Sequence, residues 1–143
     1  MGLQITADDP IDHLNQTQEL CDKVRQTAYE IHLYHGHGHL EKVYENALFH
    51  RLKKSGVKIT QQYPVKVYDE DQTMVGEYFA DLLIEEKLIV ELKTSKALCL
   101  EHEAQILGYL KSTGIQHGLL INFGSYQFSI RKFAKLKKSV PSI

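Results

Sequence analysis

Two acidic residues and a lysine, Asp81, Glu91 and Lys93, stand close together along this chain of 143 residues. Two carboxylates brought side by side can hold a hard divalent cation such as Mg²⁺ or Mn²⁺, with water and phosphate oxygens in its other positions. Such an ion lowers the pKa of bound water and neutralises charge that develops on a phosphoryl group. A neighbouring lysine can orient the water, accept its proton or stabilise the transition state, and all three roles stay open.

A tight hairpin would bring these side chains together in space. Residues 75–84 and 88–94 are rich in apolar side chains, and the polar cluster 85–87 separates them, which is typical of two strands joined by a short turn. If the turn has three residues, counting outward from it places Asp81 directly opposite Glu91.

The three-residue turn also separates polar from apolar side chains. Because side chains alternate across a strand, Glu91 and Lys93 then share one face with Asp81. The other face is predicted to be wholly apolar and to consist of Ala80, Leu82, Ile84, Leu88, Val90 and Leu92. A two-residue turn would place Asp81 against Leu92 and mix polar with buried positions, which burial of one face penalises.

Like charges directly opposite each other destabilise a pair of strands, so Asp81 and Glu91 need a compensating group. A bound divalent cation would supply it. A structural cluster of ion pairs with Lys93 is the alternative interpretation, but two acids and one cation leave a charge that a partly buried site tolerates poorly. We therefore predict that the pair serves a metal ion.

The rest of the chain predicts the elements that hold this hairpin. Apolar residues at helical spacing predict helices at 10–34, 40–56 and 101–112, and apolar or alternating segments predict strands at 57–68, 75–84, 88–94 and 118–123. The first three strands suit an antiparallel meander. The last helix makes a crossover, so the last strand should lie parallel to the third. The predicted fold class is α/β, with a mixed central sheet flanked by helices.

Composition indicates one globular domain over residues 1–143. Hydrophobic residues make up 43% and charged residues 24% of the chain, which excludes collagen-like, mucin-like and disordered proteins. The spacing of Cys21 and Cys99 matches neither a zinc module nor a dense disulfide framework, so we expect ordinary thiols. Residues 1–10 lack the apolar stretch of a signal peptide, and no run is long enough for a membrane helix, so we expect a soluble protein of the cytoplasm.

The formal net charge of −1 excludes a protein that holds nucleic acid mainly by bulk positive charge. The distribution of charge is nevertheless uneven. Residues 126–143 contain no acidic side chain and five basic ones, Arg131, Lys132, Lys135, Lys137 and Lys138. This basic C-terminal segment is either a solvated face or a contact for a polyanion.

Three motifs in order resemble those of a known family. The first is Gly38, Glu41 and Tyr44 in the pattern GxxExxY; the second is Asp81 followed by Glu91-Leu92-Lys93; the third is Gln105 with Tyr109, ahead of the apolar strand at 118–124. Over residues 36–124 the chain is similar to the GxxExxY branch of the PD-(D/E)XK nuclease superfamily.

The resemblance implies a restriction-endonuclease-like core. The helix at 10–34 would pack on the motif-bearing region 36–124, and the basic segment 126–143 would follow it. The implied activity is hydrolysis of the phosphodiester backbone of DNA by metal-activated water, with RNA as an open alternative substrate. Nucleic acid is the implied partner, and a homodimer in which a second copy completes the groove is one way to offset the weak net charge.

The resemblance also implies a role for each motif residue. Asp81, Glu91 and Glu41 would bind Mg²⁺ or Mn²⁺, and Lys93 would serve the nucleophile. Gln105 would position the lysine or the phosphate. Simpler interpretations stand beside these, because Glu41 in the first turn of a helix stabilises that helix and Gln105 could belong to an exposed helix face.

Two other functions remain open at this point. A catalytically inactive relative could keep the fold as a nucleic-acid-binding or regulatory module, since a fold does not establish an activity. A different hydrolase, such as a retaining glycosidase with Asp81 and Glu91 as its two carboxylates, is the second alternative. The chain contains no tryptophan, which weakens a sugar-binding interpretation.

Four histidines, His32, His35, His37 and His39, cluster more densely than composition predicts. They could bind zinc, although the glycines between them argue for irregular backbone and no cysteine completes a ligand set. A loop at the edge of a groove, which contacts phosphates when protonated, is the alternative.

Overall fold

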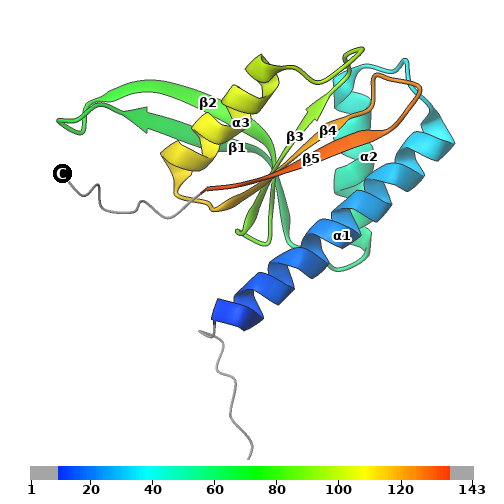
Figure 1. The fold of residues 1–143 in the computed structure, drawn as a ribbon, viewed down its shortest axis with the longest axis horizontal. Helices are drawn as coiled ribbons and strands as arrows, with labels where there is room; N and C mark the ends of the chain where they lie inside the picture. Colours follow the sequence, from blue (N-terminus) through cyan, green and yellow to red (C-terminus); the bar gives the residue numbers. More distant parts are fainter. Residues whose placement is uncertain (1–9, 136–143) are drawn as a thin grey trace, which may run out of the picture.

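The computed structural model describes residues 10–135, which form a layered α/β structure (Figure 1). In chain order the elements are α1 (Pro10–His35), α2 (Glu41–Lys54), β1 (Ile59–Tyr68), β2 (Met74–Ile84), β3 (Leu88–Lys93), α3 (Leu100–Thr113), β4 (His117–Asn122) and β5 (Ser129–Ala134). Every predicted helix and strand is present, with ends that differ by one or two residues.

The strands form one mixed sheet in the order β1-β2-β3-β4-β5. β3 and β4 run parallel, and the other neighbouring pairs are antiparallel. Parallel neighbours need a crossover connection, and α3 supplies it between β3 and β4. This topology confirms the predicted fold class and is consistent with a restriction-endonuclease-like core.

The fifth strand was not predicted, because residues 126–143 were interpreted only by their charge. β5 pairs with β4 along its whole length. Phe128 and Ile130 pack on one side of the sheet and Phe133 on the other, so the spacing of two between Phe128 and Ile130 was the available signal for this strand.

The basic side chains of β5 contact other parts of the protein. Arg131 forms an ion pair with Glu103 of α3, and the Lys132 Nζ donates a hydrogen bond to the Gln18 Oε1 of α1 over 3.0 Å. Lys137 and Lys138, the other part of the predicted basic segment, lie outside the described residues.

Helices cover both faces of the sheet (Figure 1). The face under α1 and α2 contains the larger cluster of buried apolar residues, among them Val24, Ala28, Ile31, Tyr44, Leu48, Leu82, Ile84, Val90 and Leu92. The face under α3 contains a smaller cluster with Val65, Ala80, Leu83, Ile89, Ile106, Leu110 and Leu120.

Cys21 is buried in the first cluster, Cys99 is exposed, and both are free thiols. Among residues 10–135, no helix has the length and apolar character that crossing a bilayer requires.

The turn between β2 and β3 has the three residues that the sequence predicts. The paired residues are Ile84 with Leu88, Leu83 with Ile89 and Leu82 with Val90. Glu85 and Glu86 adopt positive φ angles of 52° and 57°, which is uncommon for residues other than glycine. The Lys87 N–H donates to the carbonyl of Ile84 over 3.0 Å and closes the turn.

The alternation of faces along β2 changes at Asp81. Leu82 and Ile84 pack beneath α1 and α2, whereas Ala80 packs beneath α3. The prediction that Ala80 shares the apolar face of Leu82 was therefore wrong.

The cause lies on the neighbouring strand. Gln62 has a φ of 55° and lies between the regular pairs Gln61 with Leu82 and Tyr63 with Ala80. β1 changes faces at the same point, because Ile59 packs beneath α1 and α2 whereas Tyr63 packs beneath α3. A residue that leaves extended geometry breaks the regular alternation of side chains between the two faces of a sheet. Asp81 and Gln62 therefore lie at the point where this alternation is broken on both strands.

Candidate active site

Asp81 and Glu91 lie next to each other at the end of the β2–β3 ladder. The backbone N–H of Asp81 donates to the Glu91 Oε1 over 2.7 Å, and the backbone N–H of Leu92 donates to the Asp81 Oδ2 over 2.8 Å. Each carboxylate thus accepts a hydrogen bond from a backbone N–H of the opposite strand. These bonds lie just beyond Leu82 and Val90, the last backbone pair of the ladder. One oxygen of each group is held in a defined position by the strands.

Both carboxylates are poorly solvated. Glu91 is 3% exposed, and burial followed by the charge of Asp81 raises its pKa from the ordinary 4.5 to about 8. Burial is also the main cause that raises the pKa of Asp81. Lys93 opposes both shifts, as do the two backbone hydrogen bonds. The pair therefore lies in a place where a cation would be strongly favoured.

Glu41 reaches the same site from α2. It is the first residue of the helix, and its carboxyl accepts a backbone hydrogen bond from Thr94, just after β3. Burial, and after it the charge of Asp81, raises the pKa of Glu41, while Lys93 lowers it. The structure thus brings Glu41, Asp81, Glu91 and Lys93 into one electrostatic cluster.

The loop before α2 is held by Tyr44. The ring of Tyr44 is fully buried and stacks on Phe123 with centroids 4.5 Å apart. Its hydroxyl donates to the Gly36 carbonyl over 2.6 Å and accepts from the backbone N–H of His39 over 3.2 Å. Gly38 has a φ of 116°, which favours glycine. The glycine and tyrosine of the GxxExxY pattern therefore shape the loop that delivers Glu41.

Glu45 is a site residue that sequence reasoning missed. It lies one turn after Glu41 and is 3% exposed. Lys42, Gln61 and Gln62 surround it with hydrogen bonds of 2.6, 2.7 and 2.8 Å. The available signal was the spacing of two acids four residues apart on a helix, which is unfavourable unless something compensates.

Gln62 was missed as well, and it connects Glu45 to Asp81. Its Nε2 donates to the Glu45 Oε1, and its side chain also forms a hydrogen bond with Asp81. Gln62 is the residue with positive φ at the face switch. Such strain costs on the order of 1–3 kcal/mol and persists where the surroundings enforce it, often at functional sites.

The segment that follows Lys93 is fixed by the end of β4. The fully buried Asn122 accepts from the Ser95 N–H over 3.1 Å and donates to the Ser95 carbonyl over 2.9 Å. The Phe123 N–H donates to the Lys93 carbonyl over 2.8 Å. A Cβ on Gly124 would lie 2.2 Å from the Thr94 carbonyl carbon, so only glycine allows this close approach. The backbone around Lys93 is therefore rigidly placed.

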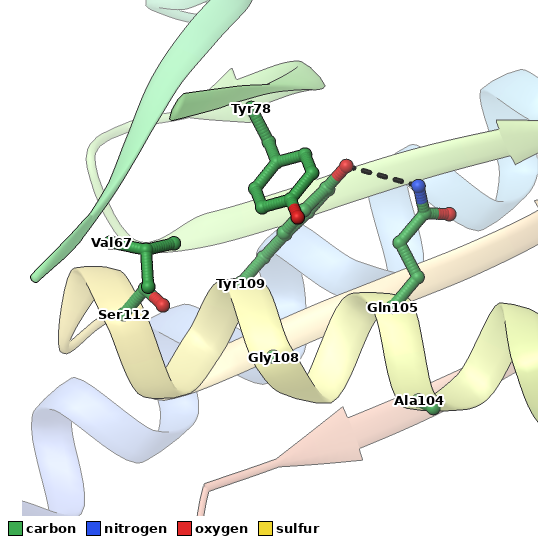
Figure 2. Close-up of a pocket in the computed structure, with 7 residues that line it drawn as sticks. All are labelled: Val67, Tyr78, Ala104, Gln105, Gly108, Tyr109 and Ser112. Carbon is green, nitrogen blue, oxygen red and sulfur yellow. Dashed lines mark hydrogen bonds between the residues drawn. The ribbon is translucent and has the colours of Figure 1, made fainter. Parts of the chain in front are cut away.

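Gln105 approaches from α3, on the other face of the sheet. Its Nε2 donates to the Tyr109 hydroxyl over 3.0 Å (Figure 2). Tyr109 is 7% exposed, and burial followed by the charge of Glu91 raises its pKa. The contact that Gln105 makes in this structure is thus with Tyr109, and its predicted contact with Lys93 or a phosphate stays a prediction.

The histidines lie in the last turn of α1 and in the loop that leads to α2. His32 is buried and bonds the Ser125 carbonyl through its Nε2 over 2.8 Å, and the rings of His35 and His39 lie 5.8 Å apart. His37 lies 6.3 Å from the ring of Tyr126. Across residues 10–135, no group of three or more His, Cys, Asp or Glu side chains has the arrangement of a metal site. The zinc interpretation therefore gains no support from these contacts.

The acidic cluster nevertheless fits Mg²⁺ or Mn²⁺ by the chemistry of its donors. These ions take oxygen ligands and are commonly held by one or two carboxylates, with water and substrate phosphate completing the shell. Asp81 and Glu91 offer such a pair, and Glu41 is close enough to add to its charge. Desolvation raises the pKa of both carboxyls, of which Glu91 is buried and Asp81 partly buried, and this suits an ion that binds them in ionised form.

The mixed sheet, its crossover through α3 and the acidic cluster at the end of β2 and β3 define a restriction-endonuclease-like α/β protein. The model of the PD-(D/E)XK nuclease superfamily matches residues 18–133, and the chain belongs to this superfamily.

A solved structure described as "Crystal structure of SSO0001" has the same fold, with a TM-score of 0.56 and 16% sequence identity. The similarity covers 68% of this chain and 52% of that chain, so the chain spans about half the length of that protein. No curated protein matches the sequence.

Proposed function

We propose that this protein is a nuclease of the GxxExxY branch that hydrolyses phosphodiester bonds of DNA with Mg²⁺ or Mn²⁺. The observation that carries the proposal is a pair of backbone hydrogen bonds, from the Asp81 N–H to Glu91 and from the Leu92 N–H to Asp81, which hold a buried and a partly buried carboxylate together. Superfamily membership supports nuclease chemistry in general.

In this mechanism Asp81 and Glu91 hold the ion, and Glu41 contributes from α2. The bound ion would lower the pKa of water and neutralise charge on the phosphoryl group. The Lys93 ammonium lies near all three carboxylates, where it orients the attacking water and stabilises the charge that develops on the phosphate oxygens. Asn122 fixes the backbone that follows Lys93 and so limits the positions that its side chain reaches.

A cleavage assay tests this proposal. Purified protein is incubated with single-stranded and duplex DNA in Mg²⁺ or Mn²⁺, with and without chelator. We expect cleavage that the chelator abolishes and that Lys93→Ala lowers by about a hundredfold or more. Lys54→Ala is the matched control, because Lys54 is exposed at the opposite end of α2 from Glu41 and should leave the rate unchanged.

Three outcomes would contradict the proposal. An unchanged cleavage rate in Lys93→Ala would contradict the role assigned to Lys93. Cleavage that continues in the presence of chelator would show that the reaction does not need a metal ion. DNA binding without cleavage would identify the inactive nucleic-acid-binding module as the better description.

A further inference from the structure

A pocket of about 380 Å³ lies between α3 and the β1–β2 hairpin. Figure 2 shows the ring of Tyr78 on β2 above α3, beside the ring of Tyr109. The residues that line the pocket are Val67, Tyr78, Ala104, Gln105, Gly108, Tyr109 and Ser112. Its walls thus combine two aromatic rings, small apolar groups and side chains that can form hydrogen bonds.

The pocket lies near the acidic cluster, because Tyr78 in its wall precedes Asp81 by three residues on β2. Tyr109 lines the pocket, and it also lies close enough to Glu91 and Asp81 to experience their charge. Gln105 lines the pocket too and holds the Tyr109 hydroxyl. A molecule in the pocket would therefore lie beside a phosphate bound at the carboxylates.

The two rings leave an aromatic face available. The Tyr78 and Tyr109 centroids are 6.1 Å apart and their planes are tilted by 36°, so the rings do not stack on each other. Tyr78 is 55% exposed, whereas Tyr109 is buried. An exposed tyrosine beside a pocket offers the surface on which unpaired nucleobases stack.

We propose that this pocket binds an unpaired nucleobase adjacent to the phosphodiester under attack, and that the protein therefore prefers single-stranded DNA or frayed ends. This inference rests on the proposed function. A planar base stacks on Tyr78, and the amide of Gln105 and the hydroxyl of Ser112 provide donors and acceptors for its edge. A paired base would first have to leave its stack, which costs a few kcal/mol.

An apolar side chain of a partner protein is a less suitable occupant. The amide and hydroxyl groups at the pocket wall would then lose their solvent without a new partner. The position of Tyr78 three residues before Asp81 on β2 also favours a ligand that carries a phosphate next to its planar group.

Substitutions at two positions test the pocket without removing buried side chains. Tyr78→Ala removes the stacking surface from an exposed position, and Tyr78→Phe keeps it. Gly108→Leu fills the pocket edge, because no atom lies within 4 Å of the position of a Cβ on Gly108. Leucine also favours a helix over glycine, so α3 should persist, as circular dichroism can verify. Tyr126→Ala is the matched control, since Tyr126 is 84% exposed and contacts His37 instead.

All variants are made in a Lys93→Ala background, so that binding is measured without strand cleavage. Fluorescence anisotropy follows a short labelled single strand and the same strand in a blunt duplex. We expect Tyr78→Ala and Gly108→Leu to weaken single-strand binding by about fivefold or more, because stacking is worth about 1–3 kcal/mol per base. Tyr78→Phe and Tyr126→Ala should bind like the parent, and duplex affinity should change little.

Equal losses for single strand and duplex, no loss in Tyr78→Ala, or no single-strand binding by the parent would overturn the inference. If Lys93 and metal prove dispensable for cleavage while Tyr78 controls single-strand binding, the proposed mechanism fails and the pocket assignment stands. If cleavage follows the proposed mechanism but Tyr78 has no effect, only the pocket assignment fails.

Discussion

Glu91 accepts a hydrogen bond from the backbone N–H of Asp81 over 2.7 Å, while the Asp81 carboxylate accepts one from the residue that follows Glu91 over 2.8 Å. The two strands thereby orient both carboxylates, but they do not neutralise them. Asp81 still raises the pKa of Glu91. This combination of fixed position and uncompensated charge leads to the predictions that follow.

The first prediction concerns stability against pH in chelator. A Glu91 pKa of about 8 in the folded state, above the ordinary 4.5, means that the folded protein binds a proton that the unfolded chain releases. This contribution to stability is complete below pH 4.5 and is lost as pH rises through about 8. Over that interval the free energy of unfolding should fall by up to about 1.4 kcal/mol per pH unit from this residue.

Urea unfolding at several pH values measures this dependence. Glu91→Gln should flatten it, because glutamine stays neutral throughout. An unchanged pH profile in Glu91→Gln would show that Glu91 titrates normally in the folded protein.

The second prediction concerns the metal itself. Asp81→Asn should weaken Mn²⁺ binding by about tenfold or more in isothermal titration calorimetry, because the ion loses one charged ligand. Binding to the parent should strengthen as pH rises, since the raised pKa values of Asp81 and Glu91 make the ion compete with protons. Asp71→Asn, at an exposed position between β1 and β2, is the control. If Asp81→Asn binds Mn²⁺ as tightly as the parent, the ion does not bind at Asp81.

The third prediction assigns Gln62 as a positioning residue for Asp81. Gln62→Gly relieves the positive φ but removes the hydrogen bonds to Glu45 and Asp81, so the protein should fold while the cleavage rate falls by about tenfold. The concentration of Mn²⁺ needed for half-maximal rate should rise, which a purely structural role would not cause.

Gln61→Ala is the matched control for Gln62. Gln61 donates to Glu45 and Asn46, and its hydrogen bonds do not extend to Asp81. Its loss should affect stability more than the metal requirement. The same shift in metal requirement for both variants would assign the effect to Glu45 and not to Gln62.

The fourth prediction contrasts two glycines. Gly124→Ala would press a Cβ to 2.2 Å from the Thr94 carbonyl carbon, so the exit of β3 must move and the protein should lose about 1–3 kcal/mol. Gly108→Ala meets nothing within 4 Å and should stabilise α3 by about 1 kcal/mol. Chemical denaturation should thus give opposite signs, and equal effects would contradict the close packing at Gly124.

Local patterns in the sequence were enough to predict the β2–β3 turn and the three residue pairs next to it. Spacing and alternation are local properties, and only a three-residue turn keeps Leu82, Ile84, Leu88 and Val90 together on a buried face. The parallel β3–β4 pair followed from the intervening helix for a similar reason, because a crossover has one favoured hand and direction.

Predictions from local sequence patterns failed where the alternation of side chains along a strand is irregular. Ala80 lies on the α3 side because Gln62 leaves extended geometry, and no residue type at either position announces this. β5 was missed because Ile130 and Phe133 are three residues apart with two basic residues between them, so the strand shows no strict period of two.

Which distant side chains meet at the site depends on the packing of whole helices and strands against one another. Glu45 and Gln62 are 17 residues apart, and their hydrogen bond exists because α2 docks beside β1. Tyr109 approaches Glu91 because the crossover places α3 on the opposite face from α2. Such contacts depend on how whole elements pack, whereas periodicity within one segment specifies only the face that it buries.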